Sequence, residues 1–229
     1  MFGVVVEDGK PAHLMLRLKV EGGQITEIET IVLRPYDNLG FGNPAAMKPR
    51  ATFYEDVPAD QRLTTVELQE MANAYFDTLQ QNHGVVFAPF AADCNRIESG
   101  VQTTNNPAPP RVGRPDPAGI KKMGCDAQFR TGFFRFVTHI RDRRFVIADR
   151  QKGLIYAAAF FDHTGDMRKV KLTDGQVVDA QYDTPWTWQI GELFKVKDGK
   201  LQQIEALVMK APYGLQDVWS DHPQWKPAH

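Results

Sequence analysis

FKVKDGKLQQIEALVMK, residues 194–210, repeats the pattern of LKVEGGQITEIETIVLR, residues 18–34, at a fixed offset of 176 positions. Both stretches alternate apolar and polar residues around a glycine-containing turn, which predicts an antiparallel hairpin in each. The identical pairs include Lys19 with Lys195, Gly23 with Gly199 and Glu29 with Glu205. The second copy is preceded by enough sequence for a complete domain, whereas the first begins almost at Met1. We therefore interpret the N-terminal unit as half of a module.

Outside the hairpins, turn signals and composition divide the chain into four segments. Alternating or β-branched runs at 3–7, 13–20 and 25–34 are separated by Asp8-Gly9 and Gly22-Gly23, which predicts a three-stranded meander. A proline-rich stretch follows, and its aromatic residues indicate that it lies against the protein. The expected segments are a partial unit at 1–35, an ordered linker at 36–63, a complete domain at 64–215 and a C-terminal tail at 216–229.

The complete domain begins with helical signals. Thr64-Thr65-Val66-Glu67 is a capping box, and apolar residues follow at helical spacing until Gly84. The same period over 120–141 predicts a second helix with His139 near its end. Between the two helices we expect a short polar strand at 91–104 and a proline-loaded loop at 105–119 that borders a site.

The rest of the domain has the alternation typical of β-strands. We expect four strands, at 144–148, 153–162, 186–197 and 201–210, joined as an antiparallel meander. The predicted fold class is therefore α+β. Its N-terminal helices would pack on a curved, cone-shaped antiparallel sheet, preceded by a partial copy of the same sheet. The open end of such a cone would be a pocket.

Composition narrows the classes of partner. The chain has 229 residues, 42% of them hydrophobic, and a net charge of −1, without a basic run that could follow a phosphate backbone. We therefore expect a small-molecule ligand and neither nucleic acid nor membrane as partner, because the sequence also has no apolar run of membrane-spanning length. The start FGVVVEDG lacks a basic region and a cleavage signature, so any leader would lie upstream of Met1 and we favour the cytoplasm.

The two cysteines, Cys94 and Cys125, form no CxxC motif, so we expect no metal site. Three interpretations of the pair stay open: two buried thiols, a disulfide that joins them, or a catalytic thiol. The sequence also lacks GxGxxG, GxxxxGK[ST], HExxH and GxSxG, and we expect no cofactor.

The strand predicted around residues 93–99 carries the first candidate site. Period-two alternation places Cys94, Arg96 and Glu98 on one face. In an enclosed site Arg96 would stabilise developing negative charge while Glu98 moves a proton. The alternative is an ion pair that lies along a solvated strand and contributes little.

Glu192 is the second candidate, because it falls in phase with an aromatic and aliphatic row along strand 186–197. If that row faces a pocket, desolvation would raise the proton affinity of the carboxyl towards a value useful for acid–base chemistry. If the row faces outward, Glu192 is an exposed acid at an interface. Glu205 has a similar but weaker claim.

Strand 153–162 and the two helices supply further candidates. Three successive alanines at 157–159 leave space for a ligand or for a closely packed helix. Tyr75, at helical spacing in the first helix, is a further candidate, the alternative being a core tyrosine. The predicted catalytic residues are Arg96, Glu98, Glu192 and Tyr75, and the predicted substrate-binding residues are Cys94, Phe129, Tyr156, Phe160, Asp162 and Trp188.

Four stretches together carry a family resemblance: DCNRIESGVQTT (93–104), GLIYAAAFFDHTG (153–165), ELFKVKDGKLQQIEALV (192–208) and APYG (211–214). Their order resembles the nuclear transport factor two-like superfamily, also called SnoaL-like or cystatin-like α+β cones, and within it a double-cone subgroup. The resemblance implies that first-helix aromatic residues line the cavity, so that Tyr75 would donate its hydroxyl to a substrate oxygen. It also implies that the first unit has N-terminal helices of its own. Either the chain starts late, or the partial unit borrows its cover from another protomer, so we expect a homodimer or higher homo-oligomer.

Two functions from different classes follow. The first is a cofactor-independent isomerase, dehydratase or lyase that uses acid–base chemistry on a hydrophobic, oxygenated substrate, aromatic or polyketide-like. The second is a non-catalytic module for ligand binding or assembly. Two ionisable groups that converge on a dry cavity favour catalysis, and a filled or apolar interior favours binding.

Overall fold

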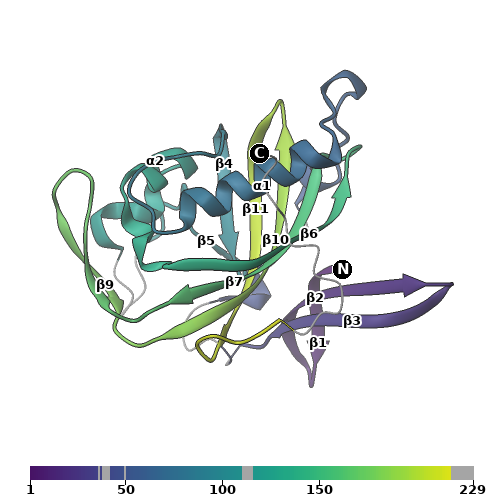
Figure 1. Cartoon of the computed structure of the whole chain (residues 1–229), viewed down its shortest axis with the longest axis horizontal. Helices are drawn as coiled ribbons and strands as arrows, with labels where there is room; N and C mark the ends of the chain where they lie inside the picture. Colours follow the sequence, from purple (N-terminus) through teal and green to yellow (C-terminus); the bar gives the residue numbers. More distant parts are fainter. Residues whose placement is uncertain (36, 38–41, 49, 110–115, 218–229) are drawn as a thin grey trace.

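The computed structural model describes residues 1–35, 37, 42–48, 50–109 and 116–217 as an α+β protein with three sheets. The main sheet has the strand order β5-β4-β11-β10-β7-β6 (Figure 1). Neighbouring strands are antiparallel except for β4 and β11, which pair in parallel, so the sheet is mixed. Its strands are β4 (Phe90–Glu98), β5 (Val101–Gln102), β6 (His139–Asp149), β7 (Leu154–His163), β10 (Trp186–Lys197) and β11 (Lys200–Ala211).

Helix α1 (Thr65–Leu79) covers one face of the main sheet, which we call the helix face. The predicted capping box is present, since the Thr64 side chain accepts from the Glu67 backbone and the Glu67 side chain accepts from the Thr64 backbone. The buried side of α1 packs on the helix face, where Tyr75 and Phe76 meet Phe194 of β10. The prediction of a helix at this position is confirmed.

The second helix predicted over 120–141 is wrong. The segment consists of a 3₁₀ turn η4 (Pro117–Lys122), a short helix α2 (Cys125–Arg130) and a second 3₁₀ turn η5 (Phe133–Phe136). Gly132, at a φ of 69°, separates α2 from η5, and the chain is extended again from His139, which is exposed at the start of β6. The helical spacing arose because α2, η5 and the start of β6 each bury apolar residues against the same core.

The prediction of a four-strand meander after residue 144 also missed two strands. A two-stranded hairpin of β8 (Met167–Lys171) and β9 (Val177–Tyr182) is inserted between β7 and β10. Val170, Leu172 and Ala180 of this hairpin region join the main core, and the hairpin contacts η4 and η5. The charged residues at 168–174 concealed its alternation.

The N-terminal unit is the predicted three-stranded meander of β1 (Phe2–Glu7), β2 (Lys10–Glu21) and β3 (Gln24–Leu33). The repeat holds in three dimensions, because Leu18 pairs with Ile28 as Phe194 pairs with Ile204. Both hairpins also have a register shift at the same place, between Lys19 and Val20 and between Lys195 and Val196. The extra residue of the bulge is Thr26 in one copy and Gln202 in the other.

The small sheet packs against the side of the main sheet that faces away from α1, which we call the back face (Figure 1). Its docked face contributes Met15, Ile31 and Leu33, which form a second core with Tyr156, Ala158 and Leu207 of the back face. Gly191 of β10 makes the close approach possible, because a Cβ there would lie 1.6 Å from the Met15 sulfur. The other side of the small sheet is its open face.

The linker predicted at 36–63 lies against the back face in the parts that the structure describes. Arg50 pairs with the buried Glu205, and the fully buried Lys195 donates to the carbonyl oxygens of Glu55 and Lys152 at 2.6 Å each. Val57 is buried and bonds the Gln151 backbone. The linker and the small sheet together cover the back face.

Candidate functional site

The register of the main sheet places two acids on the helix face. Glu192 of β10 lies opposite Ala157 of β7 on one side and Ala206 of β11 on the other. Ala206 in turn pairs with Glu98 of β4. Glu192 and Glu98 therefore lie on either side of the Ala206 methyl group, and both residues opposite Glu192 have small side chains.

Arg96 lies between these acids and helix α1. Its side chain is 3% exposed and donates to three groups: Nε to the Tyr75 hydroxyl at 3.1 Å, Nη2 to Glu98 at 2.7 Å, and Nη1 to the Gln128 side-chain oxygen. The guanidinium also lies over the rings of Phe129 and Phe134, at 4.7 and 5.0 Å from their centroids. A buried arginine thus connects the first helix, the strand and α2.

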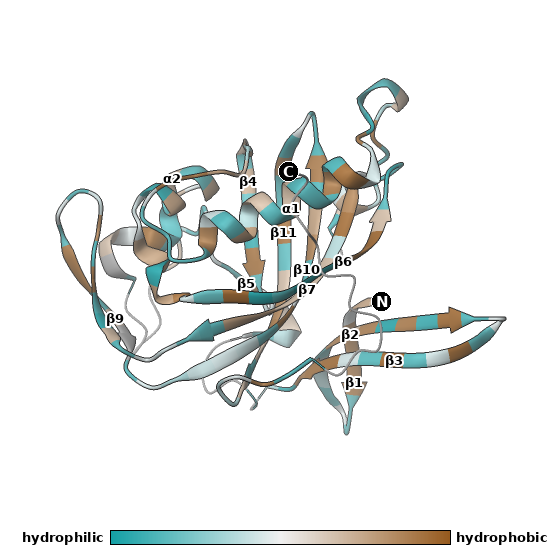
Figure 2. Ribbon diagram, in the orientation of Figure 1, coloured by the Kyte–Doolittle hydropathy of each residue, from teal (hydrophilic) through white to brown (hydrophobic). Residues whose placement is uncertain are grey.

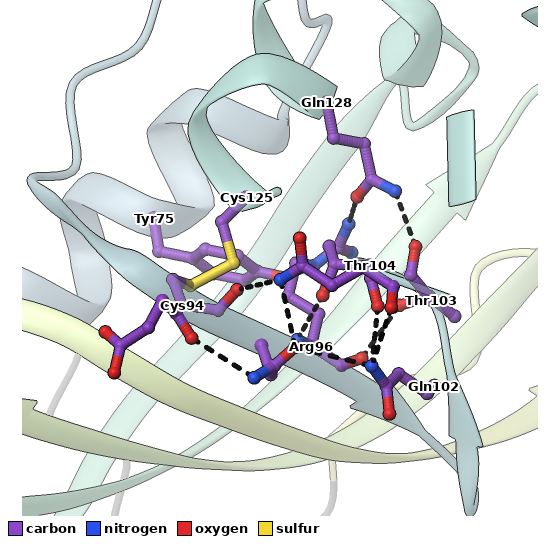
Figure 3. Close-up of a disulfide and its surroundings, with 11 residues drawn as sticks. Tyr75, Cys94, Arg96, Gln102, Thr103, Thr104, Cys125 and Gln128 are labelled. Atoms are coloured by element: carbon purple, nitrogen blue, oxygen red, sulfur yellow. Dashed lines mark hydrogen bonds between the residues drawn. A yellow bond between two sulfur atoms is a disulfide. The ribbon is translucent and has the colours of Figure 1, made fainter. Parts of the chain in front are cut away.

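Residues that the sequence did not single out hold Arg96 in place (Figure 3). Gln128 of α2 is buried and donates through its amide to the carbonyl oxygens of Thr103 and Ile120. The Thr104 hydroxyl accepts from the Arg96 backbone at 2.7 Å. A glutamine at a buried position of a short helix, one turn after a cysteine, is a weak sequence signal, so Gln128 could not be found in advance.

Cys94 and Cys125 form a disulfide between β4 and α2, beside Arg96 (Figure 3). This settles the three interpretations of the cysteines in favour of the disulfide and excludes a catalytic thiol in this state. Because Cys94 is two positions from Arg96 and Cys125 three from Gln128, the bond joins the two segments that hold the guanidinium. Cys94 therefore supports the site and does not present a thiol to a substrate.

The surroundings of Glu192 bring the pKa of its carboxyl close to neutral pH. The residue is 2% exposed, and burial raises the pKa of its carboxyl to about 8, against the lowering effect of Arg96; Glu98 raises it further and a hydrogen bond from Tyr75 lowers it. Its Oε2 atom is buried and has no hydrogen-bond partner among the residues that the structure describes. A buried oxygen without a protein partner is costly, so a bound molecule that forms a hydrogen bond with this atom would be stabilised there.

The pKa values of Tyr75 and Arg96 are both raised, so neither side chain is a base at neutral pH. Burial raises the pKa of Tyr75 well above its ordinary value, although Arg96 opposes that effect, so the phenol stays protonated. Burial acts to lower the pKa of Arg96, but Tyr75, Glu98 and Glu192 outweigh it and the net pKa is raised. Both side chains are therefore hydrogen-bond donors at neutral pH.

The structure brings together Tyr75, Arg96, Glu98, Glu192 and Phe129, and Trp188 lies on the same helix face, where its ring is 4.8 Å from that of His163. Three predicted substrate-binding residues lie elsewhere. Tyr156, Phe160 and Asp162 are on the back face: Tyr156 bonds the Met15 sulfur, Phe160 lies under Arg141, and Asp162 pairs with Arg141 and Thr187. They support the packing of the sheets, and Glu205 on the same face is held by Arg50.

The predicted site-bordering loop at 105–119 is described only in part, since residues 110–115 lie outside the described residues. Its beginning is held beside β4, where the Asn105 side chain donates to the Cys94 carbonyl at 2.9 Å. In the described part of the chain no cluster of His, Cys, Asp and Glu has the arrangement of a metal site. The described helices include none that is long and apolar enough to span a membrane.

Comparisons with known proteins give the family and little more. No curated protein matches the chain. A de novo designed protein with a curved β-sheet is similar at 14% identity and a TM-score of 0.34, covering 64% of this chain and 88% of its own. AclR from Streptomyces galilaeus, described as "a putative hydroxylase", is similar at 10% identity and a TM-score of 0.33, covering 63% of this chain and 90% of its own.

Both likenesses are too distant to bear on chemistry. A family profile, in contrast, matches residues 61–208, which is most of the chain and includes α1, the main sheet up to Val208 of β11 and the Arg96–Glu192 cluster. The chain therefore belongs to the DUF8021 family, which is described as a domain of unknown function.

Proposed function

We propose that this protein is a cofactor-independent isomerase, dehydratase or lyase in which Glu192 exchanges a proton with a small oxygenated substrate. The observation that carries the proposal is the unpartnered, fully buried oxygen of Glu192 beside two fixed donors, Arg96 and Tyr75. Acid–base enzymes use a carboxyl with a pKa near the working pH, and burial supplies such a value here.

The hydrogen bonds suggest which carboxyl oxygen carries the proton. Tyr75 accepts from Arg96 and bonds Glu192, so one carboxyl oxygen is occupied as an acceptor. With a pKa of about 8 the carboxyl is mostly protonated at neutral pH, and the proton belongs on the free Oε2. Glu192 would then act as a general acid towards a substrate oxygen and as a base on the return step.

Arg96 and Tyr75 would stabilise the charge that develops on an enolate or alkoxide. Glu98 is the most exposed member of the cluster, with 17% of its side chain accessible, and would pass the proton on towards solvent. The residues opposite Glu192, at positions 157 and 206, are alanines with the smallest side chains of that face. The surrounding phenyl rings favour a hydrophobic, planar substrate, aromatic or polyketide-like.

The cone architecture and the relation to the nuclear transport factor two-like superfamily are part of this proposal. Support comes from the order of helix, strand and sheet in residues 64–211 and from the position of Tyr75 on the first helix. The sequence favoured the cytoplasm as the compartment of this protein. Because disulfides form and persist in oxidising compartments, the Cys94–Cys125 bond supports an oxidising compartment instead.

One observation favours the alternative, a ligand-binding or assembly module without catalysis. Arg96 already has three hydrogen-bond acceptors and two aromatic rings around it, which is the environment of a structural arginine. Four rings, those of Phe76, Phe90, Phe129 and Phe194, also surround Tyr75. In that case the cluster around Arg96 stabilises the fold, and the protein binds a ligand without converting it.

Native mass spectrometry of the purified protein, combined with a screen of hydroxylated and keto aromatic compounds by NMR, tests the two functions. We expect compounds that shift the resonances of Glu192 and Trp188, and turnover of at least one of them. Glu192→Gln should abolish turnover and keep binding, and Arg96→Lys should weaken both because a lysine cannot reach three acceptors. Arg130→Lys, at an exposed arginine of α2, is the matched control.

Turnover that survives Glu192→Gln would exclude the catalytic role. Binding without any turnover of the bound compounds would favour the binding module, and resonance shifts confined to the back face would move the site away from Glu192 altogether.

A further inference from the structure

The open face of the small sheet has the composition of a protein interior. Its positions along residues 14–20 of β2 and 25–32 of β3 are Leu14, Leu16, Leu18, Val20, Ile25, Ile28, Thr30 and Val32, which alternate with the docked face. Hydrophobic and hydrophilic bands alternate along both strands in Figure 2. Large side chains of this face are exposed: Ile28 by 63%, Val20 by 59%, Ile25 by 56% and Leu18 by 43%. A soluble surface seldom presents so many aliphatic side chains on adjacent strands.

The internal repeat explains this composition without reference to any other protein. With the offset of 176, seven of these eight positions correspond to residues of the helix face that are buried in the main core: Ile190, Phe194, Val196, Leu201, Ile204, Ala206 and Val208. The eighth, Leu16, corresponds to Glu192. In the complete copy α1 covers these residues, whereas among the described residues no helix lies over the open face.

All ionic groups along β2 and β3 between Arg17 and Glu29 are directed to the other side. Arg17 pairs with Glu29 and Lys19 with Glu27 across the strands of the docked face, and Glu29 also bonds Arg144 of β6. The eight open-face positions carry no charge. Glu7 and Lys10, which share their phase, lie at the far end of the sheet, where Glu7 pairs with Arg34. Two copies of the apolar stretch can therefore meet without burying an unpaired charge, which would be the main cost of such a contact.

The size of the face is comparable with that of a small protein interface. Strands β2, β3 and β1, of twelve, ten and six residues, at about 3.4 Å per residue and about 4.8 Å between strands, give a footprint on the order of 450 Å². Two such faces would bury about 900 Å² of flat footprint, close to the roughly 1,000 Å² that a specific interface between proteins needs. Two twisted sheets stack face to face at about 10 Å with their side chains interdigitated.

We propose that the open face of the small sheet is the interface of a homodimer, with a second copy of this chain as its occupant. The arrangement is a two-fold, sheet-on-sheet contact in which the same residues of each protomer meet. The active-site proposal is independent of it, because the Glu192 cluster lies on the opposite side of the main sheet. In the dimer the second protomer lies over the open face as α1 lies over the helix face.

Sedimentation equilibrium over a range of concentrations tests the proposal with the full chain. We expect a species of twice the 25.9 kDa chain mass for the unmodified protein. Ile28→Lys and, as a second variant on the other strand, Val20→Lys should each weaken the dimer at least about tenfold, because each places two charges in one apolar contact. Val177→Lys is the matched control, since Val177 is a strand residue of β9 that is 60% exposed. Circular dichroism verifies that each variant is folded.

A monomer at every concentration would overturn the proposal, whether or not the monomer captures an added amphipathic helical peptide on the open face. A dimer that Val177→Lys weakens as much as the two open-face variants, or that neither open-face variant weakens, would also overturn it by placing the interface elsewhere.

Discussion

At the scale of single residues, the buried carboxyl of Glu192 distinguishes this protein. Glu192 stands in a row of aromatic and aliphatic residues, and the sequence alone marks it as an acid out of place. Alternation along β4 likewise predicts that Arg96 and Glu98 share a face, and they do, 2.7 Å apart. What alternation cannot give is which face of a strand is covered, since that depends on distant segments. This is why Tyr156, Phe160 and Asp162 were assigned to the site although they lie on the back face.

The raised pKa of Glu192 predicts a pH-dependent stability. The carboxyl binds a proton more tightly in the folded state, with a pKa of about 8, than in the unfolded chain, with a value of 4.5. Its stabilising contribution is thus complete below pH 4.5 and is lost as the pH rises to 8, by about 1.4 kcal/mol per unit. Glu192→Gln cannot lose a proton, so relative to this variant the unmodified protein should lose a few kcal/mol of unfolding free energy between these pH values.

Urea unfolding at a series of pH values measures the difference between the two proteins. Glu70→Gln, at an exposed acid of α1, should leave the pH profile parallel to that of the unmodified protein. Parallel profiles for Glu192→Gln as well would show that Glu192 is ionised throughout this range.

At the scale of elements, local signals predicted α1, the first meander and the two repeated hairpins, because caps, glycine turns and alternation act within a few residues. They failed over 120–141. There tertiary packing of short pieces produces the helical spacing of Cys125, Phe129 and Phe133. The disulfide, which the spacing of the two cysteines could not establish, holds α2. Helix α2 has only six residues and would not be stable alone.

The disulfide should therefore stabilise the protein as a clamp on α2. Cross-linking residues that are 31 positions apart removes conformational freedom from the unfolded chain, which contributes about 3–4 kcal/mol. The double variant Cys94→Ala/Cys125→Ala should lose that amount of unfolding free energy in guanidinium titrations. A reducing agent should destabilise the unmodified protein and leave the double variant unchanged, and an equal response of both would show that the bond does not form in solution.

At the scale of the whole molecule, the back-to-back docking of the small sheet on the main sheet could not be read from the sequence. In the small sheet the docked face carries the ion pairs Arg17–Glu29 and Lys19–Glu27 and the open face is the more apolar one, so hydrophobicity alone would select the wrong face, and the choice depends on complementary shape. The shape is set by Gly191, where the absence of a side chain admits Met15 and the hydroxyl of Tyr156. The parallel pairing of β4 with β11 is another long-range feature that local patterns do not contain.

The close contact at Gly191 predicts a coupled pair of mutations. Gly191→Ala places a methyl group 1.6 Å from the Met15 sulfur, so the sheets must separate or the methionine must move, at a cost of about 1–3 kcal/mol. Met15→Ala removes the obstacle, and Gly191→Ala should cost clearly less in that background. Urea unfolding of the two single variants and the double variant measures the coupling. Strictly additive costs would mean that the two residues do not touch.

The matching bulges at Thr26 and Gln202 limit how the two hairpins can change in length. Loss of a bulge residue would leave every flanking side chain on its present side and would only straighten the ribbon. Deletion of any regularly paired residue would turn every side chain of the strand beyond it to the opposite face of the sheet, so that apolar and charged residues would exchange places. Natural or engineered shortening of either ribbon is therefore expected at these two sites, or in steps of two residues elsewhere.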